Sequence, residues 1–429
     1  MKAHVLRCAF KRPILASQTV GLRCAFKRPI LVRFASQTAG DRERGQVISA
    51  KADIDNRLLT IQCSEGLPSY RLPFAYIWEQ RNSGSRRRPA DDRRAMGITP
   101  PTHVEVASNK RRVRVKWSTN ETTELDVDWL NEHFVSEPND FNCPFSNDVK
   151  RLELWESEYR SNVATFDFEK ILEDDDHVIK LLFKLQSRGL VLIKGAKAQS
   201  GELKKLCRQL GPAKSTPYGE LTKILSLYNS TSIGCTTKRF DLHSDFADLT
   251  YPSEWFFLHC IDQLSNPLEG GGWYCDGFAV AGHMKKEYPK LFDALSSTVT
   301  PFRDVGATPF IGGFDARSYW PLLCLHENGE MKRLVIGNHS RDDRFKAKNK
   351  SRLFGWYEAY SRFMQLATDH RFLINVRLEP GDIVVVHNAR VLHGRPEYKQ
   401  SEGELRCLEA LHFDRDSVYS KLRAKMAGN

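Results

Sequence analysis

The sequence has few of the features that mark membrane-spanning, disulfide-stapled or zinc-stabilised proteins. Its ten cysteines among 429 residues stand singly, without a Cys-x-x-Cys pair, which argues against a disulfide framework and a structural zinc knuckle. No apolar run approaches the roughly 20 residues of a membrane span. With 41% hydrophobic and 27% charged residues, the chain is globular in composition and long enough for two domains.

Common catalytic signatures are also missing. The chain has no Gly-x-Ser-x-Gly motif and no Cys–His protease pattern. The glycine run at 270–272 lacks the Lys-Ser/Thr pair that completes a phosphate-binding loop. A hydrolase of these classes and a P-loop enzyme are therefore disfavoured.

Acidic residues are absent from the first 40 positions, which carry eight Lys or Arg. Since the whole chain has a net charge of +11, the remainder carries only 11 − 8 = +3. The Arg-rich stretch 86–94 contains no aromatic residue that could stack on a base. Nucleic acid is therefore not expected as a partner, and neither is a membrane.

The basic segment is a tandem repeat, with LRCAFKRPIL at 6–15 and again at 22–31. An Arg-rich, Ser-containing and acid-free N-terminus is typical of a mitochondrial transit peptide, and VRFAS after Leu31 offers a processing point. The alternative is a disordered basic arm on a cytoplasmic protein. In both cases residues 1–44 are expected to lie outside the fold.

A small β-rich domain is expected at 45–137. Period-two alternation predicts strands in LLTIQC, SYRLPFAYIW, HVEVAS, RRVRVKW and TTELDV. Residues 81–101 are interpreted as a long exposed loop, and 138–146 as a linker rich in turn formers.

The larger domain is expected at 150–429. A helix is predicted before Gly189, another at ELKKLCRQLG, and two more near 280–296 and 351–369. Strands are predicted at KILSLYN, EWFFLHC, GGWYCDGF, RLVIGN, FLINVRL and DIVVVHN. Many strands without βαβ alternation favour a mainly β fold with flanking helices, a double-stranded β-helix or jelly roll.

Three residues suggest a metal site. His243 and Asp245 stand at i and i+2 in HSD, so on an extended segment both side chains project from one face. Alone this pair is weak evidence, since a surface turn would look the same. His393 follows the buried strand IVVVH and can return to the first segment across a jelly roll. Two His and one carboxylate form the facial triad of non-haem Fe(II) oxygenases.

An anion site is suggested by Arg406 in the strand-like run ELRCLEALHF. A core-facing Arg there would need an anion, and a guanidinium suits the distal carboxylate of 2-oxoglutarate. His259 and Cys260 are better interpreted as core residues. For His412, core and pocket positions are equally open.

These motifs resemble those of the γ-butyrobetaine and trimethyllysine dioxygenase family, within the taurine-dioxygenase-like Fe(II)/2-oxoglutarate enzymes. The resemblance covers roughly residues 46–425. It rests on TTKRFDLHSDFADLTYPSEWFFLHC, WYCDGF, HNARVLHGR and RCLEALHFDRDSVYSKLR. It implies iron on His243, Asp245 and His393, and 2-oxoglutarate at Arg406 and Leu258. It also implies O2 as co-substrate, ascorbate as reductant and a small-molecule substrate, and it leaves a homodimer open.

Three departures from the family pattern stand out. The stretch YIWEQRNSGSRRR lacks the three cysteines of the family's zinc cluster, so we expect no zinc. Of the aromatic cage for trimethylammonium, only Tyr218 is retained, with Thr222, Cys235 and His412 at the other positions. The family's Asp-Asn-Trp is replaced by HNA at 387–389.

The sequence therefore predicts an Fe(II)/2-oxoglutarate dioxygenase that oxidises a C–H bond of a small amino-acid-like or zwitterionic substrate. The resemblance implies substrate-binding roles for Tyr218, Cys235, Asn338, Arg341 and His412. One alternative is a γ-butyrobetaine or trimethyllysine hydroxylase of carnitine biosynthesis. The other is a catalytically inactive family member acting as a binding protein, which the retained ligands disfavour.

Overall fold

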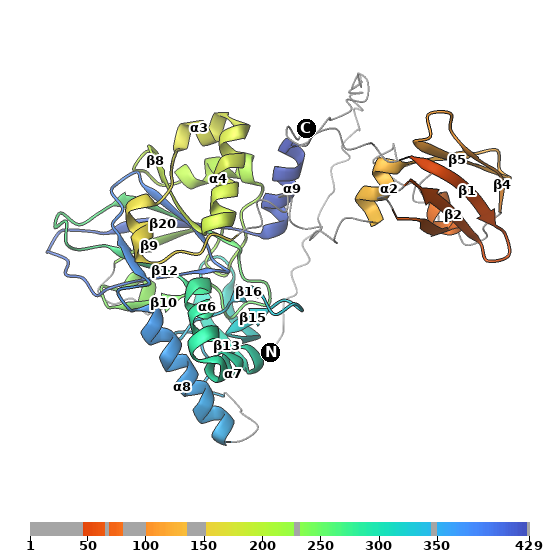
Figure 1. Ribbon diagram of the computed structural model, residues 1–429. Helices are drawn as coiled ribbons and strands as arrows, with labels where there is room; N and C mark the ends of the chain where they lie inside the picture. The colour runs from red at the N-terminus through yellow and green to blue at the C-terminus, as the bar shows by residue number, and fades with distance from the viewer. Residues whose placement is uncertain are drawn as a thin grey trace, which may run out of the picture. The chain divides into compact units, whose positions relative to one another are not determined.

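The computed structural model describes residues 46–64, 68–79, 100–134, 152–226, 232–344 and 350–426 (Figure 1). The chain divides into two compact units, residues 1–127 and 128–429. The basic segment 1–44, nearly all of the loop 81–101 and the linker 138–146 lie outside the described residues.

The first unit contains two three-stranded antiparallel sheets. One has the order β1 (Val47–Asp53), β2 (Leu58–Cys63), β3 (Tyr70–Pro73), and the other β4 (Pro101–Val106), β5 (Arg112–Trp117), β6 (Thr122–Asp126). Alternation along β5 buries Val113, Val115 and Trp117 and exposes the basic residues between them. The chain continues into helix α2 (Val127–Phe134).

One expectation for this unit was wrong. The predicted strand SYRLPFAYIW is a strand only to Pro73, and helix α1 (Phe74–Glu79) follows. Phe74 and Ile77 are three residues apart and both buried, which suits one face of a helical turn. The rings of Phe74 and Trp78 pack edge-on against Trp117, with centroids 6.3 and 5.2 Å away.

The second unit is built on two sheets that face each other. The larger has the order β7-β8-β18-β11-β20-β9 and the smaller β10-β19-β12-β17. The larger comprises β7 (Thr165–Asp167), β8 (Leu190–Lys194), β18 (Ile383–His387), β11 (Trp255–Asp262), β20 (Cys407–Phe413) and β9 (Leu221–Leu225). The smaller comprises β10 (Phe240–His243), β19 (Val391–Arg395), β12 (Gly272–Asp276) and β17 (Leu373–Val376).

A hydrophobic core fills the space between these sheets. It contains Phe256, Val384 and Ala410 from the larger sheet and Tyr274 and Val391 from the smaller one. Because side chains alternate along a strand, even-numbered positions of β11, β18 and β20 face this inner core. Odd-numbered neighbours such as Phe257 and Val385 belong to a second core on the outer face.

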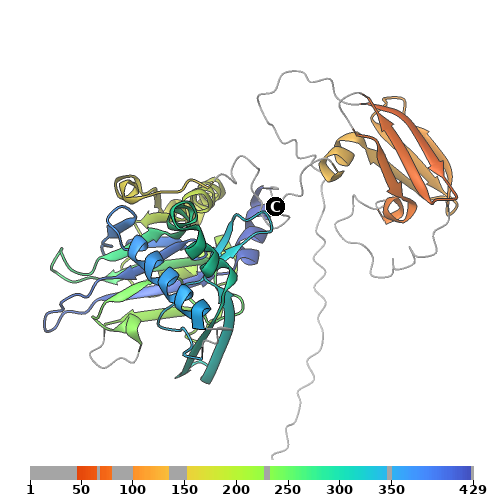
Figure 2. The ribbon, with the colours of Figure 1, turned by 60° about the horizontal axis from the view of Figure 1, so that its bottom comes forward.

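Helices cover the outer faces of both sheets (Figure 2). The outer core of the larger sheet includes side chains of α3 (Phe168–Glu173), α4 (Asp175–Arg188), the 3₁₀ helix η4 (Glu202–Leu206), α5 (Cys207–Leu210) and α9 (Arg415–Met426). The outer core of the smaller sheet includes side chains of α6 (Gly277–Glu287), α7 (Pro289–Ser297) and α8 (Lys350–Ala367). The expectation of a mainly β unit with flanking helices is confirmed.

Local sequence explains where several elements end. Helix α4 is capped by Asp174, whose side chain accepts from the backbone N–H of Asp176, and it ends at Gly189 with φ 78°. The helix expected at 280–296 is two helices, because Pro289 starts α7 and cannot donate the hydrogen bond that would continue α6. The stretch RLVIGN is a strand, β16 (Met331–Leu334), only over its first residues, and it pairs with β15 (Leu323–Leu325).

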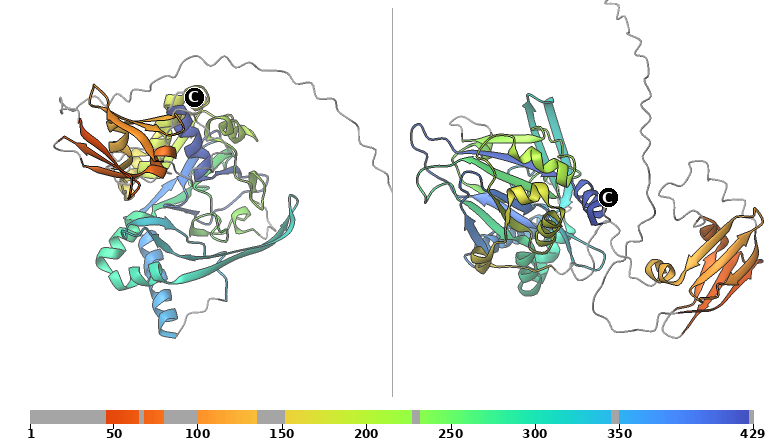
Figure 3. Two further views of the ribbon diagram at one scale, coloured as in Figure 1. Left: turned by 90° about the vertical axis from the view of Figure 1, so that its right-hand side faces the viewer. Right: turned by 90° about the horizontal axis from the view of Figure 1, so that it is seen from above.

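A hairpin of β13 (Val299–Thr308) and β14 (Gly312–Pro321), which the sequence analysis missed, projects from the two sheets (Figure 3). Helix α9 was also missed. Among the described helices, none is long and apolar enough to cross a membrane.

Candidate metal centre

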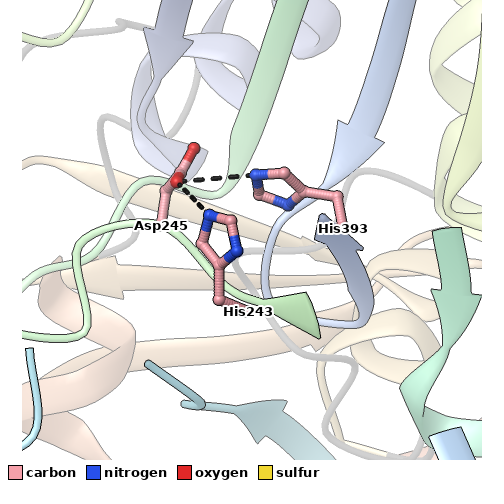
Figure 4. Close-up of side chains that lie close together, drawn as sticks. All are labelled: His243, Asp245 and His393. Atoms are coloured by element: carbon pink, nitrogen blue, oxygen red, sulfur yellow. Dashed lines mark ion pairs between the residues drawn. The ribbon is translucent and has the colours of Figure 1, made fainter. Parts of the chain in front are cut away.

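The three expected metal ligands lie together on the inner face of the smaller sheet. His243 ends β10 and pairs directly with His393 of β19, and Asp245 follows two residues later. Nε2 of His243 is 3.4 Å and Nε2 of His393 is 3.5 Å from Oδ1 of Asp245 (Figure 4). All three candidate ligand atoms lie within 4.8 Å of one another.

The close approach of β10 and β19 depends on Gly394, which follows the second imidazole. A Cβ at Gly394 would stand 2.6 Å from the carbonyl oxygen of Phe240 and 3.0 Å from that of Asp241. Any side chain there would push β10 away, and His243 with it. The Gly of the His-Gly-Arg motif therefore serves the geometry of the two histidines.

Each imidazole is held in a fixed orientation. Nδ1 of His243 donates to the carbonyl of Asp241 at 2.8 Å, so its Nε2 carries the lone pair that faces Asp245. Phe240 stacks on His243 with centroids 3.9 Å apart, and Phe256 stacks on His393 at 4.7 Å. Burial lowers the pKa of His393, which keeps this imidazole in the neutral form that binds metals.

Asp245 is fixed through its backbone. The side-chain amide of Asn388 accepts from the Asp245 N–H at 2.7 Å and donates to the Asp245 carbonyl at 3.0 Å. Burial raises the pKa of Asp245, but the imidazoles of His393 and His243 outweigh it and hold the pKa well below its usual range. The carboxyl is thus an anion, as a metal ligand requires.

His412 lies on the opposite side of the same carboxylate. Its Nε2 is 3.8 Å from Oδ2 of Asp245, and its Nδ1 is 3.0 Å from Oγ of Ser253. Burial lowers the pKa of His412 to about 4. His412 therefore lies next to the carboxylate of the metal centre.

Two imidazoles and one carboxylate oxygen whose ligand atoms lie within 4.8 Å of one another suit a divalent first-row metal such as iron. The unbonded Nε2 lone pair of His243 and the ionised Asp245 fit such an ion without rearrangement of the ligand set. A triad on one face leaves coordination positions for other ligands on the opposite face.

Arg406 stands directly before β20, and its guanidinium is buried. It is 7% exposed, and in the described part of the chain it forms no ion pair with a carboxylate. Its Nη2 reaches only the Gly270 carbonyl at 3.5 Å, and its Nε has no hydrogen-bond partner there. Leu258 lies opposite Ala410 on the inner face, two residues after the Phe256 that stacks on His393.

A second arginine, Arg395, is already satisfied. Its guanidinium donates to the carbonyls of Ile233 (2.9 Å), Thr236 and Lys238. These bonds hold the segment that contains the 3₁₀ helix η5 (Ile233–Cys235), and with it Cys235. Arg395 is therefore not available to bind an anionic co-substrate.

The expected substrate residues occupy several places around the centre. Thr222 faces the inner core opposite Ala410. Asn338 is exposed, and Arg341 packs its guanidinium over the rings of Trp356, Tyr357 and Tyr360 at 5.1–5.2 Å. Nη1 of Arg341 is buried and has no hydrogen-bond partner among the described residues.

Two acidic residues, Asp304 and Asp248, lie close enough to Tyr218 to act on its hydroxyl. Its hydroxyl donates to Oδ2 of Asp304 at 2.6 Å, and its ring meets Phe314 of the hairpin edge-on at 5.9 Å. Burial raises the pKa of Asp248 to about 6, and the carboxylates of Asp304 and Asp245 add to the rise. Asp248 is 5% exposed and has no ion pair or hydrogen bond with another described residue.

Sequence reasoning missed the residues that support the site. Asn388 clamps Asp245, and its neighbour His387 donates from Nε2 to the buried Glu254 at 3.0 Å. Asp276 and Arg390 form a fully buried ion pair at 2.7 Å that joins the start of α6 to the turn before β19. All three pairs come from motifs quoted above, but only the fold shows which residues are partners.

Comparison with known proteins agrees with this geometry. The model of the family "Taurine catabolism dioxygenase TauD, TfdA family" matches residues 148–410. The chain is 29% identical to the Gamma-butyrobetaine dioxygenase of Homo sapiens over 315 residues, 73% of this chain and 80% of that protein. It is 24% identical to the Trimethyllysine dioxygenase of Neurospora crassa over 358 residues, 75% and 72% of the two chains. The PvcB protein of Pseudomonas aeruginosa is similar at a TM-score of 0.43 and 18% identity, covering 64% and 95%.

Proposed function

This chain belongs to the taurine catabolism dioxygenase TauD, TfdA family, and we propose that it is an Fe(II)/2-oxoglutarate-dependent dioxygenase of small amino-acid-like or zwitterionic molecules. The observation that carries the proposal is the convergence of the candidate ligand atoms of His243, Asp245 and His393 within 4.8 Å. The buried Arg406, without an ion pair among the described residues, supports it. The names of the relatives, which are dioxygenases, support the same reaction class.

Iron would be held by Nε2 of His243, Oδ1 of Asp245 and Nε2 of His393. When bound, Fe(II) and 2-oxoglutarate supply the oxidising chemistry: O2 is consumed, 2-oxoglutarate leaves as succinate and CO2, and one oxygen atom enters the substrate. The protein orients the ligands through Asp241 and Asn388. It also packs Phe240 and Phe256 against the two imidazoles, which limits water at the centre.

The distal carboxylate of 2-oxoglutarate would pair with Arg406. A guanidinium buried without an anion is costly, and a carboxylate that forms two charge-assisted hydrogen bonds removes that cost. Tyr398 supports the guanidinium from one side, with its ring centroid 5.5 Å away. Leu258, on the inner face of β11, is the proposed apolar contact of the co-substrate.

For the substrate, the side chains favour a cation that carries N–H groups. A trimethylammonium needs several ring faces, and Thr222, Cys235 and His412 provide none of the expected rings. The unpaired carboxylate of Asp248 and the Tyr218–Asp304 pair can instead accept hydrogen bonds from an ammonium or guanidinium. A carboxylate on the same substrate would find Nη1 of Arg341, and Asn338, three residues earlier in the chain, is a further proposed contact.

The relatives favour a second candidate, γ-butyrobetaine or trimethyllysine as substrate. Both candidates use the same metal centre and differ only in the cation. The two are separated by measuring substrate-dependent succinate release for γ-butyrobetaine, trimethyllysine and a panel of amino acids at saturating 2-oxoglutarate. Preferred turnover of a primary amine supports the first candidate, and efficient formation of carnitine refutes it.

Three coarser proposals complete the assignment. The two facing sheets support a double-stranded β-helix over 150–429, with a small domain at 45–137 that holds no zinc. The composition of residues 1–44 supports mitochondrial targeting, as does the name "Trimethyllysine dioxygenase, mitochondrial" of a Mus musculus relative. Import of the full chain into isolated mitochondria, with and without residues 1–44, tests the proposed targeting.

A further inference from the structure

The two oxygens of Asp245 face different partners. Oδ1 faces the metal position, 3.4 and 3.5 Å from the two ligand nitrogens of His243 and His393. Oδ2 points the other way, with Nε2 of His412 as its neighbour at 3.8 Å. The carboxylate therefore has one oxygen on the metal side and one on the His412 side.

The surroundings of His412 favour one tautomer. The anionic Asp245, whose Oδ2 is 3.8 Å from Nε2, favours a hydrogen on that nitrogen. On the other side of the ring, Nδ1 is 3.0 Å from Oγ of Ser253, whose hydroxyl can donate to it. A neutral imidazole that accepts at Nδ1 carries its hydrogen on Nε2, the atom that faces Asp245.

Packing fixes the ring in this position. His412 is 3% exposed, and the ring of Phe256 stacks on it at 5.0 Å with 21° between the planes. Phe246 meets it edge-on at 4.8 Å. Asn388, which donates to Ser253, also holds the backbone of Asp245, so the donor and its target are positioned by the same side chain.

We propose that His412 is a positioning residue for the metal centre, holding Oδ2 of Asp245 so that only Oδ1 reaches the ion. This inference rests on the proposed function. A carboxylate that turns to bind through both oxygens takes up a position that 2-oxoglutarate or O2 needs. An imidazole N–H that faces Oδ2 across 3.8 Å, a distance longer than a hydrogen bond, attracts that oxygen electrostatically and disfavours the rotation, in the way that surrounding groups orient metal ligands in general. The sequence analysis expected His412 to contact the substrate. The positioning role proposed here is a different one.

The test compares His412→Phe, which keeps a ring and removes the donor, with His412→Gln, which keeps an N–H donor. Metal-free protein is titrated anaerobically with Co(II), whose ligand-field absorption reports both affinity and coordination. We expect His412→Phe to weaken metal binding about 10- to 100-fold and to change the spectrum, and His412→Gln to restore much of both. Ser253→Ala should reduce the metal affinity less than His412→Phe does. Adding Ser253→Ala to His412→Phe should reduce the affinity no further.

His259→Phe is the matched control, because this buried imidazole lies on β11 opposite Glu409 and on the other face of the sheet. It should leave the Co(II) spectrum unchanged, and melting of the metal-free proteins verifies that each variant folds. Unchanged metal affinity in His412→Phe together with a raised KM for substrate would make His412 a substrate contact and overturn the inference. If the wild-type protein itself binds no metal, the proposed function fails instead.

Discussion

Nε2 of His393 lies 3.5 Å from Oδ1 of Asp245, although the two residues come from segments far apart in the chain. The approach follows from sheet pairing, since His393 is the direct partner of His243 across β19 and β10. The metal centre is therefore formed by the neighbouring strands β10 and β19 of the smaller sheet and by the segment that follows β10. Variants at the three ligands should disturb metal binding while leaving the rest of the sheet intact.

Arg406→Ala should weaken 2-oxoglutarate binding. Removal of a buried charge-assisted partner costs about 2–5 kcal/mol, which corresponds to a rise in the dissociation constant of roughly 1.5 to 3.5 decades. Arg406→Lys keeps the charge but loses the planar fork, so it should fall in between. Anaerobic titration of the charge-transfer band of the iron-loaded protein measures this directly.

Arg395→Ala provides the contrasting variant. Because Arg395 donates to the carbonyls around η5, its loss should alter the KM for substrate and leave the dissociation constant of 2-oxoglutarate within a few-fold of wild type. The opposite pattern, with Arg395 controlling 2-oxoglutarate and Arg406 without effect, would exchange the two assignments.

Asp248→Asn tests the recognition of an N–H-bearing cation. Loss of one charged acceptor should raise the KM for a primary-amine substrate about 10- to 100-fold, because a charge-assisted hydrogen bond contributes roughly 1.5–3 kcal/mol. The variant should not improve turnover of γ-butyrobetaine. An unchanged KM across the amine panel would remove Asp248 from the substrate site.

The buried carboxylate of Glu254 gives a pH-dependent prediction for stability. Burial raises the pKa of Glu254, but the hydrogen bond from His387 and the charges of Arg333 and Arg415 outweigh it and hold the pKa well below its usual range. A lowered folded-state pKa means that the stabilisation is complete above the unfolded value of about 4.3 and is lost as the pH falls toward the folded value.

Glu254→Gln should therefore lower the free energy of unfolding by about 2–4 kcal/mol at pH 7. The difference from wild type should narrow as the pH falls below about 4. Urea unfolding at several pH values measures both, with the exposed Glu402→Gln as the control. A difference that stays constant down to pH 3 would show that the ionised carboxylate is not responsible.

The N-terminal unit should contain no stoichiometric zinc. The stretch that matches the family's zinc cluster has no cysteine, and Cys63 alone cannot supply four ligands. Elemental analysis of protein purified in a mild chelator should give far less than one zinc per chain. About one tightly held zinc would require a ligand set that the sequence does not suggest.

Local patterns predicted most of the second unit but not its long-range partners. The apolar run IVVVH and the alternation around EWFFLHC correctly gave β18 and β11, because buried strands have a distinctive composition. The pairing of His243 with His393, the clamp of Asn388 on Asp245 and the direction of His412 depend on tertiary contacts. No single-sequence periodicity contains that information.

The failures have local causes. Tyr288–Pro289 divides what looked like one helix, and the turn after Pro73 forms α1 although its residues alternate like a strand. The β13–β14 hairpin escaped notice because its polar and glycine-rich residues lack a buried face over much of its length. The sequence named Tyr218 as the one retained residue of the aromatic cage and Thr222, Cys235 and His412 as departures from it, but only the structure revealed the carboxylate that pairs with Tyr218.

The central claim is that His243, Asp245 and His393 bind an iron ion that 2-oxoglutarate can chelate. The most direct measurement is anaerobic titration of the Fe(II)-loaded protein with 2-oxoglutarate, recorded as metal-to-ligand charge-transfer absorption. Wild-type protein should develop the band at one equivalent of each. His243→Ala, Asp245→Ala and His393→Ala should lose it or need at least tenfold more iron while still folding. An iron-loaded wild-type protein without the band, or any one of these variants with wild-type behaviour, would contradict the claim.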